Sequence, residues 1–106
     1  MTKLKEIRVI LPLPRPVKLE ILECHDRFIE KVSKEFGGIT YVDSYGLWYD
    51  AEIKQMVSEE GRIYTIASPE NKFDILESYA VMCACEMGEK CLYITDIDGN
   101  VNFIEL

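Results

Sequence analysis

The sequence has little positive charge. It contains 12 Lys and Arg against 19 Asp and Glu among 106 residues, which gives a formal net charge of −7 and a pI near 4.7. Proteins that bind DNA or RNA gain much of their affinity from Lys and Arg on phosphates, so this balance argues against a nucleic-acid partner. An excess of acidic residues is typical of a surface that keeps a protein soluble.

Long apolar runs are also missing. No stretch approaches the roughly 18 apolar residues of a membrane helix, and no continuous apolar segment follows the N-terminal lysines as in a signal peptide. We therefore expect a cytoplasmic protein with no membrane partner. Only 4 residues are proline and 48% are hydrophobic, a composition that predicts one ordered domain over residues 1–106.

The residues of common catalytic machinery are few. His25 is the only histidine, and no serine lies in a nucleophile-elbow pattern, so a hydrolase triad has little support. We expect His25 to be a half-exposed helix residue. The sequence lacks a Gly-x-x-x-x-Gly-Lys phosphate loop. We accordingly predict no catalytic residue.

Four cysteines invite a test for a metal site. Zinc-ribbon spacings are absent, and Cys83 and Cys85 would point to nearly opposite sides of a helix that holds both. We predict no metal and no cofactor, with Cys24 and Cys83 as small buried hydrophobic residues. A redox role for Cys85 or Cys91 stays open and would need an exposed thiol of low pKa.

What the sequence does contain is an alternation of strand and helix patterns. Apolar residues recur every three or four positions from Val17 to Phe36, and Gly37-Gly38 ends this predicted helix. A second helix is predicted up to Met87, with Ser68-Pro69 suited to its first turn. Strands are predicted at residues 5–11, 39–50, 62–67, 91–95 and 101–104, with a bulge or break near Gly46 and a short helical turn at 53–57.

The order of these elements is β-α-β-β-α-β-β. It predicts an α+β fold, a ferredoxin-like βαββαβ sandwich with an extra C-terminal strand in a hairpin and with both helices on one face of an antiparallel sheet. The other face would be open, and Tyr41, Tyr64 and Tyr93 have the size to cover it.

Two surfaces are candidates for binding. Asp43 and Asp50 flank an aromatic segment that includes Tyr45 and Trp48, and acids beside aromatic rings can bind a sugar or a cation, so these four residues form a predicted ligand site.

The second surface lies on the second helix, where Ile75, Tyr79 and Met82 make an apolar band beside the core band. A helix packed on one sheet needs only one band, so the second predicts an interface. Together with the open sheet face, it predicts a homo-oligomer.

Three segments resemble a pattern in small uncharacterised prokaryotic and phage α+β proteins. They are Phe36-Gly37-Gly38-Ile39-Thr40, Gly46-Leu47-Trp48-Tyr49-Asp50 and Gly61-Arg62-Ile63-Tyr64. The pattern is Phe-Gly-Gly-x-Thr, then Gly-x-Trp-x-Asp, then Gly-x-x-Tyr. The resemblance covers residues 28–66 and implies a strand-helix-strand-strand unit, without an established activity or cofactor. The likeness to ferredoxin-like and nitrogen-regulatory PII-like oligomers is one of topology.

Two functions remain open on this basis. The absence of a catalytic constellation favours a non-enzymatic cytoplasmic module of regulatory type, which self-associates and binds a protein partner or a small ligand. The alternative is a small enzyme or sensor whose site lies at a subunit interface and uses His25, Asp43 or Asp50. These side chains would then have to lie close together.

Overall fold

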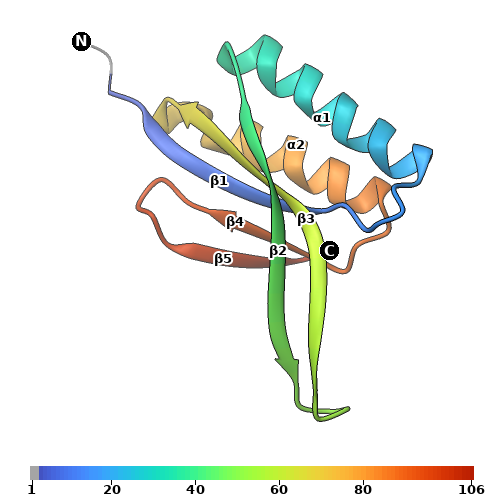
Figure 1. Ribbon diagram of the computed structural model, residues 1–106. Coiled ribbons are helices and arrows are strands. Elements are labelled where there is room, and N and C mark those ends of the chain that lie inside the picture. The colour runs from blue at the N-terminus through green and yellow to red at the C-terminus, as the bar shows by residue number, and fades with distance from the viewer. Residues whose placement is uncertain (1–2) are drawn as a thin grey trace.

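Five strands and two helices make up the computed structural model, which describes residues 3–106 (Figure 1). The elements are β1 (Lys5–Pro12), α1 (Leu19–Phe36), β2 (Thr40–Asp50), β3 (Gln55–Ser68), the short 3-10 helix η1 (Glu70–Lys72), α2 (Phe73–Glu86), β4 (Cys91–Thr95) and β5 (Val101–Glu105).

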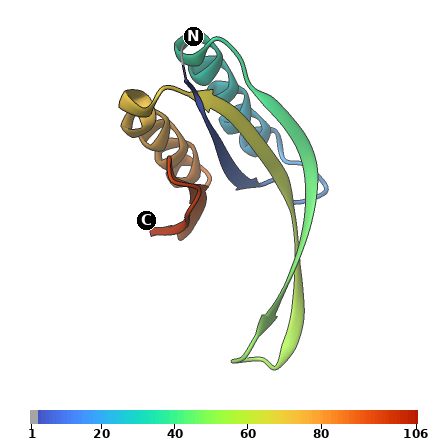
Figure 2. The same ribbon diagram turned by 90° about the vertical axis from the view of Figure 1, so that its left-hand side faces the viewer.

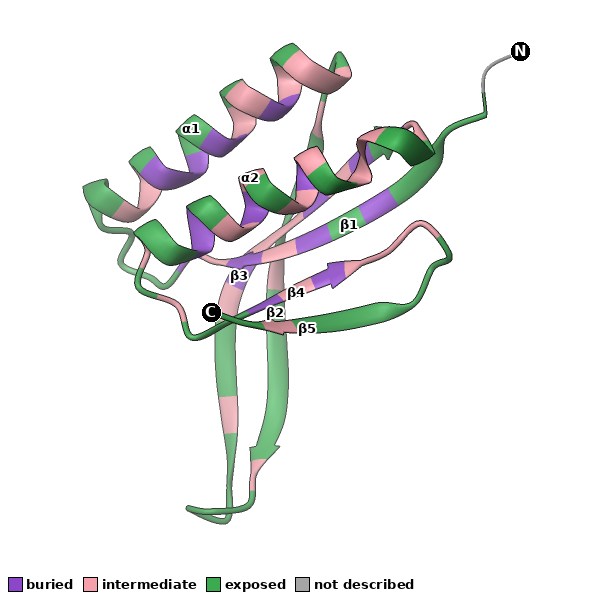
Figure 3. Cartoon of the chain, turned by 180° about the vertical axis from the view of Figure 1, so that it is seen from behind, coloured by how far each residue is buried: buried purple, intermediate pink, exposed green. Residues whose placement is uncertain are grey.

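The strands form one antiparallel sheet in the order β2-β3-β1-β4-β5. Both helices lie on the same side of this sheet, and the core fills the space between them and β1, β3 and β4 (Figures 2 and 3). In β1 the alternation of side chains places Ile7, Val9 and Leu11 in the core, where they meet Phe28 of α1 and Leu76 of α2. The opposite sheet face has no helix over it.

The predicted ferredoxin-like βαββαβ sandwich is wrong as a description of this fold, although the α+β class is right. The order of elements, β-α-β-β-α-β-β, is the predicted one, but it exceeds a βαββαβ unit by one strand, and β5 is a full member of a single five-stranded sheet. It pairs with β4 along its whole length, from Cys91 opposite Glu105 to Thr95 opposite Val101. The turn at Gly99, with φ of 82°, allows this tight return.

Two helix boundaries differ from prediction. Helix α1 ends as expected, because Gly37 adopts a φ of 88° and its N–H bonds to the Ser33 carbonyl, but the helix begins only at Leu19. Ser68 does not cap α2. It lies in β3, its hydroxyl donates to the Pro69 carbonyl, and η1 separates it from α2.

The hairpin of β2 and β3 is longer than predicted. The strands pair without interruption through Gly46, which lies opposite Glu59, so the expected bulge near Gly46 is wrong. The expected helical turn at 53–57 is wrong as well, since β3 already begins at Gln55. Cross-strand pairs of Trp48 with Val57 and Tyr49 with Met56 explain the extension, because such apolar pairs stabilise a two-stranded ribbon.

Residues 44–60 of this hairpin extend past the other strands, and we call them the arm (Figure 1). The arm gives the molecule its longest dimension, 49 Å. Its large apolar side chains are exposed; they are Tyr45, Leu47, Trp48, Tyr49, Ile53 and Met56.

A row of apolar side chains crosses the uncovered face of the sheet, one from each strand. The register places Val42, Ile63, Ile10, Tyr93 and Phe103 side by side in this order, and we call them the open-face row. Of the tyrosines predicted to cover this face, Tyr93 lies on it. The prediction is wrong for Tyr64, which is buried against Phe28, and for Tyr41, which stacks on Tyr64.

Within residues 3–106, neither helix has the length and apolar character needed to cross a membrane.

Candidate functional site

Four charged side chains meet where the arm leaves the sheet. Asp43 of β2 lies directly opposite Arg62 of β3, and Glu60 lies two residues before Arg62 and therefore on the same face. Arg15 reaches them from residues 13–18 between β1 and α1, which we call the proline-rich connector. We call Arg15, Asp43, Glu60 and Arg62 the charged cluster.

The charges of this cluster alternate in sign. Arg15 Nε is 3.5 Å from Glu60 Oε2, Arg15 Nη2 is 3.2 Å from Asp43 Oδ2, and Asp43 Oδ1 is 3.7 Å from Arg62 Nε. Only the Arg15–Asp43 contact is a hydrogen bond. Glu60 Oε2 and Arg62 Nε are buried atoms that have no hydrogen-bond partner in the described part of the chain.

The guanidinium group of Arg62 is held from several sides. Its side chain is only 15% exposed, and its Cζ lies 4.4 Å from the centre of the Tyr41 ring, a cation–π contact. Its Nη1 also donates to the Tyr64 hydroxyl at 3.4 Å. These contacts fix the orientation of a side chain that is usually flexible.

Behind Arg62 lies a buried pair, His25 and Tyr64, both 0% exposed. His25 Nε2 is 2.8 Å from the Pro12 carbonyl oxygen, which can only accept, so Nε2 carries the proton. His25 Nδ1 then accepts from the Tyr64 hydroxyl at 2.6 Å. Burial lowers the pKa of His25 and raises the pKa of Tyr64 to about 12, so both groups are neutral. The expectation of a half-exposed His25 is wrong.

The predicted site residues do not converge on one point. Asp50 pairs with Gln55 at the far end of the arm, seven residues from Asp43, which corresponds to roughly 23 Å along a strand. Tyr45 and Trp48 lie on opposite faces of the arm, since their positions differ by an odd number. His25 connects to Asp43 only through Tyr64 and Arg62.

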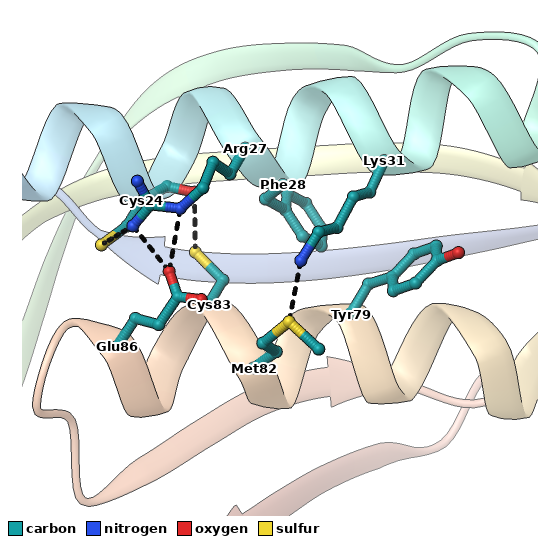
Figure 4. Close-up of a pocket in the computed structure, with 8 residues that line it drawn as sticks. All are labelled: Cys24, Arg27, Phe28, Lys31, Tyr79, Met82, Cys83 and Glu86. Carbon is teal, nitrogen blue, oxygen red and sulfur yellow. Dashed lines mark hydrogen bonds and ion pairs between the residues drawn. The ribbon is translucent and has the colours of Figure 1, made fainter.

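Two residues of the predicted interface band, Tyr79 and Met82, line a groove between the helices (Figure 4). Tyr79 and Met82 face α1 there, and Lys31 Nζ contacts Met82 Sδ at 2.8 Å. Met82 nevertheless stays 44% exposed, and Ile75 is half-buried. Arg27 and Glu86 form an ion pair of 2.7 Å across the same groove. A role of this band in an interface stays a prediction.

The cysteines behave as free thiols. Cys24 and Cys83 are buried, as predicted, and Cys83 donates a hydrogen bond to the Cys24 carbonyl. Burial raises the pKa of both thiols, that of Cys83 to about 12, so neither is a thiolate at neutral pH. Cys85 and Cys91 are exposed, and their redox role stays a hypothesis. No group of three or more His, Cys, Asp and Glu in residues 3–106 is arranged to hold a metal ion.

The chain alone offers little enclosed space. Among the described residues, a hollow of about 200 Å³ lies between the proline-rich connector and the end of α2, near Lys18 and Met87. Pockets for small molecules are usually larger, about 300–1,000 Å³.

Sequence reasoning missed Arg15, Glu60, Arg62 and Tyr64 as site residues. A usable signal was the spacing Arg62-x-Tyr64, which places two polar side chains on one face of the strand predicted at 62–67, whereas Glu60 lies before that predicted strand.

No protein-family model and no curated protein matches the sequence. Two solved structures share its fold. A phage SAM lyase in complex with S-methyl-5'-thioadenosine has a TM-score of 0.71 at 13% identity, with 100% of this chain and 92% of that chain covered. A phage SAM lyase in the apo state has a TM-score of 0.68 at 16% identity, with coverage of 95% and 88%.

Proposed function

We propose that the chain is a small enzyme that binds and cleaves S-adenosylmethionine (SAM) at a site completed by a second copy of itself. The observation that carries this proposal is the fold shared with a phage SAM lyase over 100% of the chain. The fold-sharing proteins are enzymes, so they give no support to the non-enzymatic regulatory module that the sequence favoured.

The chemistry of the charged cluster supports this proposal. SAM carries a positively charged sulfonium, and a chain of net charge −7 with Asp43 and Glu60 at the arm base attracts a cation. When the bond between sulfur and the amino-acid side chain breaks, its electron pair goes to sulfur. S-methyl-5'-thioadenosine then leaves as a neutral thioether, and positive charge develops on the carbon of the four-carbon fragment that was bonded to sulfur. A nearby carboxylate stabilises that charge. An oxygen atom of water, which then gives up a proton, or of the fragment's own carboxylate forms the new bond to this carbon.

Exposed aromatic rings are available for the nucleoside. Tyr41 borders the charged cluster on one side, and Tyr45 lies two residues beyond Asp43 on the same face of β2. Such rings can stack on adenine or contact a sulfonium by cation–π attraction. The arm residues predicted from sequence thus keep a role as ligand contacts, with Trp48 and Asp50 facing a second copy further out.

Self-association is part of this proposal. The open-face row and the arm expose large apolar side chains on two sides of a 106-residue chain, and surfaces of this kind usually contact other proteins. A homo-oligomer would enclose the cluster, whose residues line neither the groove between the helices nor the hollow near Lys18. We also propose a cytoplasmic location, because four free thiols suit a reducing compartment.

The direct test is to incubate the purified chain with SAM and to follow S-methyl-5'-thioadenosine by liquid chromatography. We expect time-dependent release, slowed about tenfold or more in Asp43→Asn or Glu60→Gln because one charge-stabilising group is lost. Glu30→Gln is the matched control, since Glu30 pairs with Lys34 on the exposed side of α1. Tight binding of SAM without any cleavage would instead favour a ligand-binding module, and no binding would reject the proposal.

A further inference from the structure

We propose that the charged cluster recognises a zwitterionic α-amino acid group, in which an ammonium and a carboxylate share one carbon. This inference rests on the proposed function and deepens it, because it assigns the amino-acid end of the substrate to Arg15, Asp43, Glu60 and Arg62.

The charge pattern favours a ligand that carries both charges. The cluster has two positive and two negative groups, linked in the order Glu60, Arg15, Asp43, Arg62 by contacts of 3.5, 3.2 and 3.7 Å. A simple anion that approaches Arg62 also meets Asp43, and a simple cation at Glu60 also meets Arg15. A ligand with both charges on adjacent groups can pair each of them with its opposite.

Two atoms of the cluster have unused hydrogen-bonding capacity. Arg62 Nε is a buried donor and Glu60 Oε2 a buried acceptor, and neither has a hydrogen-bond partner among residues 3–106. Their ion-pair contacts, at 3.7 and 3.5 Å, are not hydrogen bonds. A ligand carboxylate can accept from Arg62 Nε, and a ligand ammonium can donate to Glu60 Oε2. The missing partners therefore match the two ends of an α-amino acid.

The surroundings of Arg62 fix its donor direction. Tyr41 covers one face of the guanidinium, and the Tyr64 hydroxyl accepts from Nη1. Tyr64 is in turn held by the buried His25. Tyr41, Tyr64 and His25 are positioning residues in this scheme. Together they hold the guanidinium of Arg62 so that its Nε side faces the cluster.

The test uses two probes that share a nucleoside and a neutral thioether sulfur. S-adenosylhomocysteine carries the amino acid group, and S-methyl-5'-thioadenosine has a methyl group in its place. We expect calorimetric titration of the full chain to show tighter binding of S-adenosylhomocysteine. Arg62→Gln and Arg15→Gln should each weaken this probe about tenfold and change S-methyl-5'-thioadenosine less than about twofold, because a charge-assisted hydrogen bond is lost for one probe only.

Controls keep the test decisive. Arg27→Gln, which removes an arginine of the helix groove, should leave both affinities unchanged. Arg15 is 55% exposed, so Arg15→Gln remains informative if Arg62→Gln fails to fold. Equal losses for both probes, or no preference for S-adenosylhomocysteine, would overturn the amino-acid site while the proposed function stands. Failure of the wild-type chain to bind either probe would overturn both.

Discussion

His25 is the residue that joins three parts of the molecule. It lies on α1, accepts from Tyr64 of the sheet and donates to Pro12, which directly precedes the proline-rich connector. Each of its ring nitrogens has one partner, and the arrangement works only for a neutral ring with the proton on Nε2. Protonation of Nδ1 would turn this nitrogen from an acceptor into a donor, so the Tyr64 hydroxyl would lose the acceptor for its own proton.

This arrangement predicts a pH-dependent stability. Burial lowers the pKa of His25 in the folded state, so the unfolded chain binds the proton more tightly. The stabilisation is fully present above the unfolded pKa of about 6.5 and is lost as pH falls below it toward the folded pKa. Between pH 7 and 5 the free energy of unfolding should fall by up to about 1.4 kcal/mol per pH unit, measured by urea denaturation.

The control for this prediction is His25→Gln, which keeps one donor and one acceptor but does not titrate. Its unfolding free energy should vary less between pH 7 and 5 than that of the wild type. Glu86 and Asp96 titrate at more acidic pH, since hydrogen bonds to Arg27 and Asn102 lower the pKa of their carboxyl groups. Equal slopes for the two proteins would contradict a neutral buried His25.

The burial of His25 could not be predicted from sequence. Its partners Pro12 and Tyr64 are 13 and 39 residues away, and helical periodicity reports only whether a side chain faces the core side of its own helix. Cys24 and Cys83 were predictable, because a small apolar residue on an apolar stripe needs no distant polar partner. The same limit applies to Arg62, because its partners Tyr41 and Asp43 lie on another strand.

At the scale of elements, Gly61 marks the place where three strands meet and the arm begins. It lies opposite Pro12 of β1 and Ser44 of β2. A Cβ at this position would come within 2.7 Å of the Leu11 carbonyl oxygen, which is backbone and cannot rotate away. Only glycine fits without a shift of β1 or β3.

Gly61→Ala should therefore destabilise the fold by about 1–3 kcal/mol, the usual cost of inserting an atom into a packed region. Urea denaturation measures this difference. Gly46→Ala is the matched control in the same hairpin, since its nearest contact is the Glu59 carbonyl at 3.8 Å, an ordinary distance. A Gly61→Ala protein as stable as Gly46→Ala would show that the strands are not in close contact at this point.

The elements differ in how well local sequence predicts them. The end of α1 followed from Gly37 alone, because a left-handed glycine closes a helix without help from other segments. The course of residues 51–61 could not be predicted from local sequence in this way. Their polar composition resembles a turn region, and only the pairing of Trp48 and Tyr49 with β3 makes them part of a long ribbon.

At the scale of the whole molecule, the open-face row lies on the side of the sheet that neither α1 nor α2 covers (Figure 2). Val42 and Phe103 at its ends are 58% and 70% exposed. Light scattering coupled to gel filtration should give a mass that is a multiple of 12.3 kDa across a concentration series. Phe103→Lys should shift this mass toward the monomer, because it places a charge in the apolar row.

Met82→Lys tests the competing surface. Met82 lies in the groove between the helices and is 44% exposed, and we expect its substitution to leave the mass unchanged. If Met82→Lys dissociates the oligomer and Phe103→Lys does not, the interface lies on the helix band predicted from sequence. If the wild type is a strict monomer, the proposed self-association is overturned, and so is the proposal that two copies share the site.

The overall arrangement was only partly predictable. The order of elements follows from local periodicity, and so does the α+β class. The pairing of β5 with β4 follows from the local turn, whereas the protrusion of the arm depends on pairing between segments. The ferredoxin-like assignment failed at this scale, because the joining of all five strands into one sheet and the length of the β2–β3 hairpin are properties of the assembled sheet.

The arm has one more consequence, which concerns variation in length. Beyond Ser44 and Glu60 its two strands pair with each other and not with β1 or β4, so residues can be added or removed there without disturbing β1, β4 or the helices. Because side chains alternate along a strand, a change of two residues in each strand preserves which face every side chain occupies. Natural variants of this fold can thus adjust the reach of the ribbon in small steps while the body stays constant.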